Sequence, residues 1–271
     1  MRLTVGANPI KPSTMLTPKE AEIASLTYET VDVLGVPVGV FTRTELTAMF
    51  LRILESRQRG WISYVNVHSI NLAYSIDWLK KYLQNSILTY CDGHGVRVGA
   101  ALLGRKMNRR IVFTDWIYDV CTIAIQTGIG VYLLGAEESV LEKAKNNLLK
   151  SYPSLIISGS HHGYFTSQET PGIVHLINSS GAEILIVGMG MPRQEKWIQE
   201  QFTALKPRLV FNAGSCFDYV AGTKKRCPSW LGKIGFEWIY RLLQDPGRLW
   251  KRYLIGNPLF IYRIIKARLF T

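Results

Sequence analysis

Short apolar runs alternate with stretches of helical spacing along most of the chain. After a β-rich run at 31–40, broken by Gly35 and Pro37, strands are predicted at 61–67, 87–91, 130–134, 155–158, 183–187 and 208–212. Helices are predicted between them at 69–82, 96–103, 115–126, 139–150, 170–180 and 192–204. Strands that are apolar throughout and alternate with helices are typical of a parallel sheet buried on both faces. The pattern therefore predicts an α/β fold, a parallel sheet with helices on both faces.

The ends of the chain differ from this middle part. Residues 1–30 are polar, contain three prolines and show no periodicity, so we expect a loose N-terminal segment. After Gly222 the strands stop, and the pattern predicts aromatic-rich helices interrupted near Pro246 and Pro258. We therefore expect an α/β core over 31–222 and a helical C-terminal appendage over 223–271.

Charge separates the core from the appendage. The 271 residues carry a formal net charge of +12, yet residues 223–271 alone hold eleven basic and two acidic side chains. Such a concentration of positive charge points to an anionic partner for the tail. Basic, aromatic helices suit a membrane–water interface, but they also suit nucleic acid or a helical cap with a solvated basic face. Composition alone leaves these three alternatives open.

Composition also argues against several classes of protein. A hydrophobic fraction of 47% with 19% charged residues argues against global disorder. No run reaches the roughly 18 apolar residues of a spanning helix, and the N-terminus lacks the apolar run of a signal peptide. The four cysteines are far apart, which argues against a zinc site or a disulfide scaffold and favours a reducing cytoplasm.

Candidate chemistry follows the predicted strands, because ligands of parallel α/β sheets bind beyond the carboxyl ends of the strands. Asp92 comes directly after one strand, and Gly93 and Gly95 would let the backbone approach a ligand. A carboxylate there could take a proton from a substrate hydroxyl. The alternative is that Asp92 caps the following helix.

A second strand ends in a glycine-rich turn, Gly188-Met189-Gly190-Met191-Pro192. The turn is not a G-x-G-x-x-G fingerprint, because Arg occupies position 193, and the chain has no Walker A sequence. With Pro192 as the first residue of a helix, its N–H groups could still bind a diphosphate. The alternative is a plain strand-to-helix turn.

The sequence contains little that points to a metal or to a serine nucleophile. His161 and His162 are adjacent, so on an extended segment they would point to opposite faces and make a poor metal pair. Neither a D-x-D pair nor a G-x-S-x-G elbow is present. We therefore predict no metal site and no cofactor.

Several segments in series resemble one family. They are Cys91-Asp92-Gly93-His94-Gly95-Val96, Gly188-Met189-Gly190-Met191-Pro192-Arg193-Gln194-Glu195, Gly214-Ser215-Cys216-Phe217-Asp218, Arg226-Cys227-Pro228, Glu237-Trp238-Ile239-Tyr240-Arg241 and Asp245-Pro246-Gly247-Arg248. In this order they resemble the WecG/TagA/CpsF glycosyltransferases (glycosyltransferase family 26), over about residues 31–255.

The resemblance implies an inverting, metal-independent enzyme with a Rossmann-like core. It would move a sugar from a UDP-sugar to a polyprenyl-diphosphate-linked glycan in cell-surface polysaccharide synthesis. The sugar would be N-acetylmannosamine, its uronic acid, glucose or glucuronic acid. The resemblance places such an enzyme peripherally at the cytoplasmic face of the cell membrane, with the appendage on the anionic surface and no nucleic-acid partner.

The resemblance also implies roles for individual residues. Asp92 matches the proposed catalytic base, Asn66 lies beside the sugar, and Gln194 lines the donor pocket. Arg241 and Arg248 match arginines that hold the diphosphate, and Lys251 or Arg252 would add to them. The other expected substrate-binding residues are His94, Thr114, Asp115, Gly135, Tyr164, Gly188, Met189, Gly190, Pro192 and Arg226.

Three positions depart from the family pattern. Tyr64 replaces a frequent Thr, Cys227 replaces an Ala, and the segment 112–114 lacks a frequent Gly. These changes leave the donor sugar open. Two other functions stay open as well, a nucleic-acid-binding α/β protein and an inactive scaffold, although an intact Asp92 and Gln194 argue against the scaffold.

Overall fold

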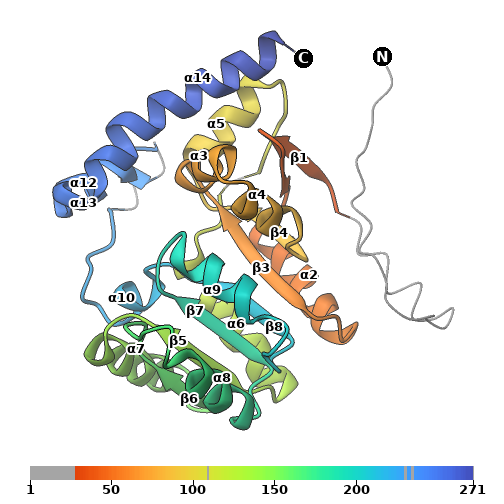
Figure 1. Ribbon diagram of the computed structural model, residues 1–271, viewed down its shortest axis with the longest axis vertical. Coiled ribbons are helices and arrows are strands. Elements are labelled where there is room, and N and C mark those ends of the chain that lie inside the picture. The colour runs from red at the N-terminus through yellow and green to blue at the C-terminus, as the bar shows by residue number, and fades with distance from the viewer. Residues whose placement is uncertain (1–27, 109, 229–230, 233–234, 271) are drawn as a thin grey trace, which may run out of the picture.

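A computed structural model describes residues 28–108, 110–228, 231–232 and 235–270. Its centre is an eight-stranded sheet in the order β1-β2-β4-β3-β8-β7-β5-β6 (Figure 1). The strands are β1 (Thr30–Val33), β2 (Val36–Gly39), β3 (Gly60–Val65), β4 (Leu88–Cys91), β5 (Val131–Gly135), β6 (Ile157–His161), β7 (Ile184–Gly188) and β8 (Leu209–Asn212). All pairings are parallel except that of β1 with β2.

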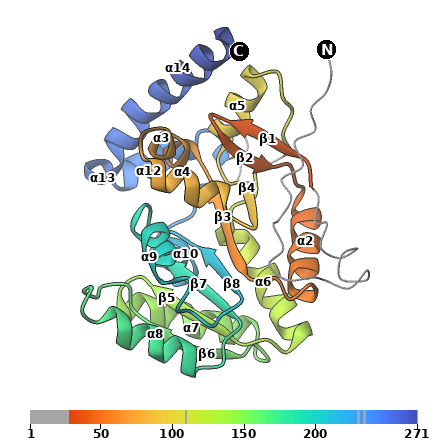
Figure 2. The same cartoon turned by 45° about the vertical axis from the view of Figure 1, so that its right-hand side comes forward.

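Helices cover both faces of the sheet (Figure 2). The helices α2 (Arg43–Glu55), α6 (Phe113–Thr127), α7 (Glu138–Ser151) and α10 (Cys216–Val220) bury their apolar sides in one core cluster. The opposite cluster contains side chains of α3 (Val67–Ser75), α4 (Asp77–Gln84), α5 (His94–Leu102), α8 (Thr170–Ser179) and α9 (Arg193–Gln201). The expected α/β fold with a covered, mostly parallel sheet is confirmed.

The run predicted as a β-rich stretch at 31–40 is a hairpin of β1 and β2, and it adds an antiparallel edge to the sheet. Leu34 and Gly35 form its turn with φ angles of 55° and 83°. Two successive positive φ angles give the turn the twist that an antiparallel pair requires. The Gly35 amide also donates to the Asp32 Oδ1 atom at 2.8 Å, which stabilises the turn.

Three local predictions differ from the structure. The helix expected over 69–82 is two helices, because Ile76 adopts an extended conformation between α3 and α4. No element was predicted over 43–55, where α2 begins with a reciprocal capping box of Thr42 and Glu45. The strand expected at 155–158 lies two to three residues later, as β6.

The appendage consists of α12 (Glu237–Gln244), α13 (Pro246–Trp250), the π-helical turn η1 (Lys251–Ile255) and α14 (Gly256–Leu269). Helix α14 packs across α3 and α5 (Figure 1). Phe260 lies over Gly99 of α5, and Arg263 donates to Asn71 of α3. Pro258 does not interrupt α14, since the first turn of a helix tolerates proline.

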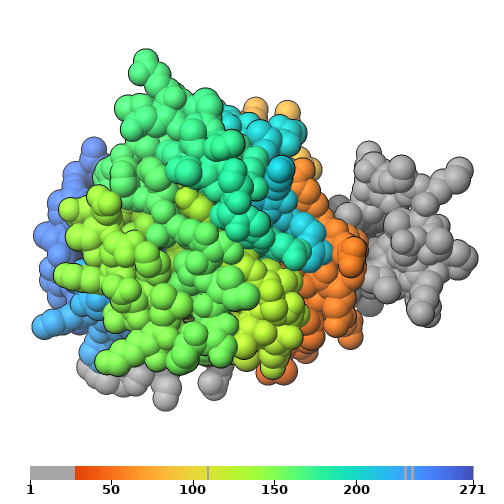
Figure 3. Space-filling view, turned by 90° about the horizontal axis from the view of Figure 1, so that it is seen from below, coloured from red at the N-terminus to blue at the C-terminus, as the bar shows by residue number. Residues whose placement is uncertain are grey.

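The appendage stays on one side of the molecule. From below, Figure 3 shows the yellow-green and green segments building most of this end, with blue segments at one edge. No helix in the described ranges combines the length and the apolar character needed to cross a membrane. Most of the predicted loose segment, residues 1–27, lies outside the described residues, but Tyr28 already packs on Phe41 with ring centroids 5.0 Å apart.

Candidate active site

Two cavities meet where the carboxyl ends of the parallel strands face the appendage. The larger, about 450 Å³, lies beyond β3, β4, β5, β7 and β8. The smaller, about 340 Å³, lies between α3, α5 and the appendage. Five residues line both: Asn66, His68, Asp92, Arg241 and Arg252. These residues therefore mark the junction at which two bound molecules would meet.

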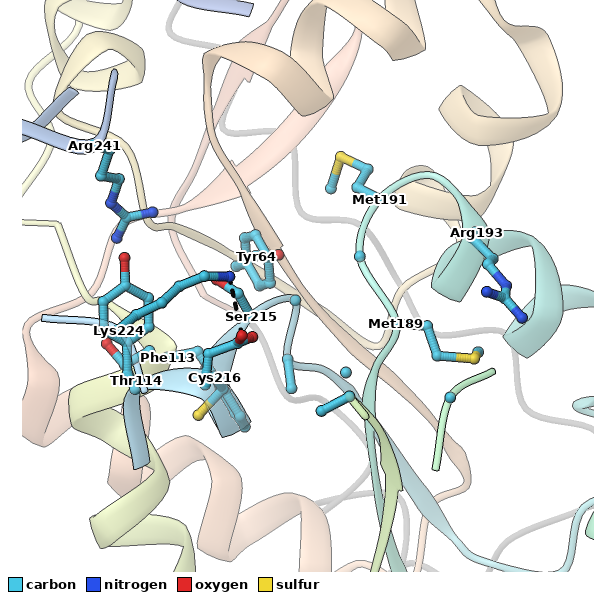
Figure 4. A pocket seen from close by; sticks show the side chains of 18 of the residues that line it. Tyr64, Phe113, Thr114, Met189, Met191, Arg193, Ser215, Cys216, Lys224 and Arg241 are labelled. Carbon is cyan, nitrogen blue, oxygen red and sulfur yellow. Dashed lines mark ion pairs between the residues drawn. The ribbon is translucent and has the colours of Figure 1, made fainter. Parts of the chain in front are cut away.

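The larger cavity has a glycine-lined floor and charged walls. Gly188 at the end of β7 and Gly190 and Gly214 in the loops after β7 and β8 line it. Its basic residues are Arg193, Lys224, Arg241, Arg248 and Arg252, and its acidic residues besides Asp92 are Glu137, Asp218 and Asp245. Figure 4 shows Arg241 and Lys224 on one side of this pocket and Arg193 on the other. Backbone amides and arginines together suit an anionic ligand such as a diphosphate.

The smaller cavity is mostly apolar. Its apolar side chains come from α3, α5 and the appendage, namely Val67, Val98, Trp238, Tyr253, Phe260 and Ile261. His94, one of the expected substrate-binding residues, also lines it, with its ring against Gly235. A molecule with an apolar part could lie here with its polar end at the junction.

Asp92 is positioned at the junction by the sheet itself, because its amide donates to Val65 O at 2.9 Å as β4 ends. Burial raises the pKa of its carboxyl group to about 7, although the charges of Arg241 and Arg110 oppose the increase. A carboxyl group with a pKa near 7 suits a general base at neutral pH. Asp92 does not cap the next helix, since Gly93 holds the N-cap position without a side-chain hydrogen bond.

Asn66 begins α3. Its Oδ1 atom accepts from the amides of His68 at 3.0 Å and Ser69 at 3.1 Å. The cap therefore fixes the side chain at the edge of both cavities. Burial, and then the charge of Arg252, lower the pKa of the adjacent His68 to about 4, so this imidazole is neutral at pH 7.

Arg241 reaches the junction from α12. Its Nη2 atom lies 2.5 Å from Glu237 Oε1, one turn earlier, and its guanidinium group lies 5.5 Å from the centre of the Tyr219 ring. Burial by itself would lower the pKa of Arg241, but Glu237 together with Tyr219, Tyr253 and Asp92 more than offsets this effect. The other Glu237 oxygen accepts from Arg110, in the loop between α5 and α6. The contact between Arg110 and Glu237 thus connects the appendage to the core.

The structure brings together about half of the other predicted site residues. Those that line the larger cavity are Thr114, Tyr164, Gly188, Met189, Gly190 and Arg248. Six residues line neither cavity: Asp115, Gly135, Pro192, Gln194, Arg226 and Lys251.

These six residues lie outside the two cavities and make other contacts. Asp115 and Arg226 form an ion pair with each other. A Cβ atom on Gly135 would lie 2.3 Å from Gly188 O, so this glycine lets β5 and β7 end close together. Pro192 is the N-cap of α9 and not its first residue. Gln194 is fully buried below the loops.

Lys251 is exposed beside Trp250, and Arg252 lies at the junction instead. The family resemblance offered these two residues as alternatives. Arg252 follows Arg248 by four residues and Lys251 follows it by three, and both spacings put side chains on one face of a helix. Spacing along the chain therefore could not choose between them. His68 and Arg110 carried no signal in the sequence either.

The two adjacent histidines do not point to opposite faces. Their ring centroids lie 4.4 Å apart, because the chain leaves β6 at His161. Within the described ranges, no group of three or more His, Cys, Asp or Glu side chains could hold a metal ion.

Comparison with known proteins shows which family the chain belongs to. Residues 31–271 match the model of the glycosyl transferase WecG/TagA/CpsF family. Proteins of Staphylococcus aureus strains MW2 and NCTC 8325 are each 31% identical over 242 residues, which cover 88% of this chain and 93% of theirs. Both are named N-acetylglucosaminyldiphosphoundecaprenol N-acetyl-beta-D-mannosaminyltransferase. The chain is thus a glycosyltransferase and belongs to the WecG/TagA/CpsF family.

Proposed function

We propose that the protein transfers N-acetylmannosamine from a UDP-sugar to an N-acetylglucosamine unit on a polyprenyl diphosphate. One observation carries the proposal: Asp92 lies where a cavity lined by glycines and arginines meets an apolar one. The names of the staphylococcal relatives support the choice of sugar and acceptor.

The donor would bind in the larger cavity. Its diphosphate would lie against the loops at Gly188–Gly190 and Gly214, with Arg241, Arg248 and Arg252 around it. When UDP leaves, negative charge develops on the diphosphate, and fixed guanidinium groups would stabilise it. These side chains would take over the role that a metal ion has in other transferases.

The acceptor would enter through the smaller cavity, with its prenyl end toward the appendage and its sugar at the junction. Its hydroxyl oxygen would attack the anomeric carbon while Asp92 takes the hydroxyl proton, and the bond from that carbon to the diphosphate oxygen would break. A single displacement of this kind inverts the anomeric configuration. General base catalysis is worth about 10²–10⁴ in rate.

The appendage would hold the enzyme peripherally on the anionic cytoplasmic face of the membrane. Leu259, Tyr262 and Leu269 of α14 are exposed, and by spacing they share one face with the exposed Ile255, which directly precedes the helix; we call these four residues the α14 stripe. Each basic residue near such a surface adds about 1 kcal/mol. Arg241 and Arg248 both line the cavity that contains Asp92, which supports a transferase over a nucleic-acid-binding protein.

The test measures UDP release from a panel of UDP-sugars with an N-acetylglucosaminyl-diphosphate-lipid acceptor. The expected result is acceptor-dependent turnover with UDP-N-acetylmannosamine, reduced about 10²–10⁴-fold in Asp92→Asn. Asp77→Asn, an exposed aspartate of α4, is the matched control and should retain full activity. Turnover with only another UDP-sugar would contradict N-acetylmannosamine as the transferred sugar. Full activity of Asp92→Asn would contradict the role of Asp92 as the general base.

A further inference from the structure

Below the two glycine loops lies a buried polar network to which the proposed reaction assigns no role. Its members Ser63, Tyr82, Gln194, Glu195 and Asn212 are each at most 2% exposed. Glu195 belongs to the Gln-Glu pair of the sequence motif, and it lines neither cavity. A buried carboxyl group is costly unless it is neutral or hydrogen-bonded, so its presence needs a reason.

One oxygen of Glu195 orients two amide side chains. Glu195 Oε1 accepts from Gln194 Nε2 at 2.8 Å and from Asn212 Nδ2 at 2.7 Å. A carboxyl oxygen that carries no proton can only accept, so with Oε1 unprotonated both side-chain NH₂ groups face it. The oxygens of Gln194 and Asn212 are thereby forced to point the other way.

The Gln194 oxygen then bridges the loops that line the larger cavity. Gln194 Oε1 accepts from the amide of Gly190 at 3.2 Å and from the amide of Gly214 at 3.0 Å. Both glycines have positive φ angles, 80° and 56°, so their amide directions depend on a backbone conformation that other residues rarely adopt. One side chain therefore fixes the spacing between the loops after β7 and β8.

The far side of the network is anchored in the sheet. Asn212 Oδ1 accepts from Tyr82 at 2.9 Å and from Ser63 at 3.3 Å, and the Tyr82 ring stacks on Trp61. Glu195 Oε2 is buried and has no hydrogen-bond partner among the described residues. Burial raises the pKa of Glu195, which favours the neutral carboxyl group at this place.

We propose that Glu195 is a positioning residue for the donor site: through Gln194 it holds the Gly190 and Gly214 loops at the spacing that binds UDP. This inference rests on the proposed function, because it assumes that the larger cavity takes the nucleotide diphosphate. It does not give Glu195 contact with any substrate.

The test compares Glu195→Leu, which removes the acceptor at similar volume, with Glu195→Gln, which keeps an oxygen in reach of both amides. We expect Glu195→Leu to weaken UDP binding and raise the donor KM about tenfold, the loss of one well-made hydrogen bond. The acceptor KM should stay unchanged, and Glu195→Gln should restore UDP binding. Glu200→Leu, on the exposed side of the same helix, is the matched control.

Normal UDP binding by Glu195→Leu, or equal impairment of the Leu and Gln variants, would overturn the proposal. If Glu195→Leu does not fold, Gln194→Met tests the same bridge, and UDP binding as tight as in the wild type would overturn it. Amide hydrogen exchange in the ligand-free protein tests the position of the two loops without any substrate, and therefore independently of the proposed function. Glu195→Leu should lose protection at Gly190 and Gly214 but not at Ala213, whose amide donates to Val187 O at 2.7 Å.

Discussion

The Glu237 carboxylate of the appendage accepts a hydrogen bond from Arg110 of the core. Its second oxygen binds Arg241, which lines both cavities beside Asp92. Burial by itself would raise the pKa of Glu237, but the two arginines hold it below its usual value. The glutamate therefore connects the position of the appendage to the charge around the proposed base.

Replacing Glu237 with glutamine should weaken this connection. The negative charge of Glu237 helps to raise the pKa of Asp92, so Glu237→Gln should move the acidic limb of the pH–rate profile to lower pH. Because Arg241 loses its partner, kcat/KM should also fall about tenfold, the cost of one charged hydrogen bond. Steady-state kinetics across pH checks both effects, with Glu200→Gln as control. A shift of the acidic limb to higher pH would contradict the proposed effect of Glu237 on Asp92.

The wild-type rate should fall as pH decreases through about 7. Burial raises the Asp92 pKa to about 7, and only the ionised carboxylate can accept the substrate proton. The positive charge of Arg241 lowers that pKa, so Arg241→Gln should shift the limb to higher pH. Arg193→Gln, which removes another cation of the same cavity, should leave the limb in place. Equal shifts in both variants would show that the effect is not specific to Arg241.

The α14 stripe should bind lipid. Replacing Leu259 and Tyr262 with serine removes two exposed apolar side chains, each worth about 1.5–3 kcal/mol when buried. Sedimentation with phosphatidylglycerol vesicles should therefore fall more than about tenfold, while turnover of a short-chain soluble acceptor stays unchanged. Leu176→Ser, an exposed leucine of α8 in the core, is the control. Unchanged sedimentation would contradict a role of the α14 stripe in membrane binding.

Docking of α14 depends on the absence of a side chain at Gly99. A Cβ atom there would lie 2.5 Å from the Phe260 ring and 3.3 Å from Ile264. Gly99→Leu should force α14 away from α5, expose residues 223–271 to limited proteolysis and reduce activity about tenfold or more, since Arg241 would lose its position. Gly172→Leu, in an open position of α8, should change neither property. A protease-resistant Gly99→Leu variant would contradict this account.

The apolar runs predicted most of the sheet because parallel strands bury both faces and show in the sequence as continuous apolar segments. Local sequence was less informative where chain direction changes. The hairpin of β1 and β2 looked like one run, and the break at Ile76 between α3 and α4 carries no proline or glycine. The capping box of Thr42 and Glu45 is a local signal in the sequence for the start of α2.

Periodicity and short motifs predict the covered α/β sheet, the family, and the position of Asp92 and two glycine-rich turns at strand ends. Those features are local along the chain. The place of Gln194 beneath the loops, and of Arg252 rather than Lys251 at the junction with Asp92, became visible only in the folded chain. Periodicity tells which side chains share a face, whereas the surface that this face meets depends on packing between distant segments, such as α14 against α3 and α5.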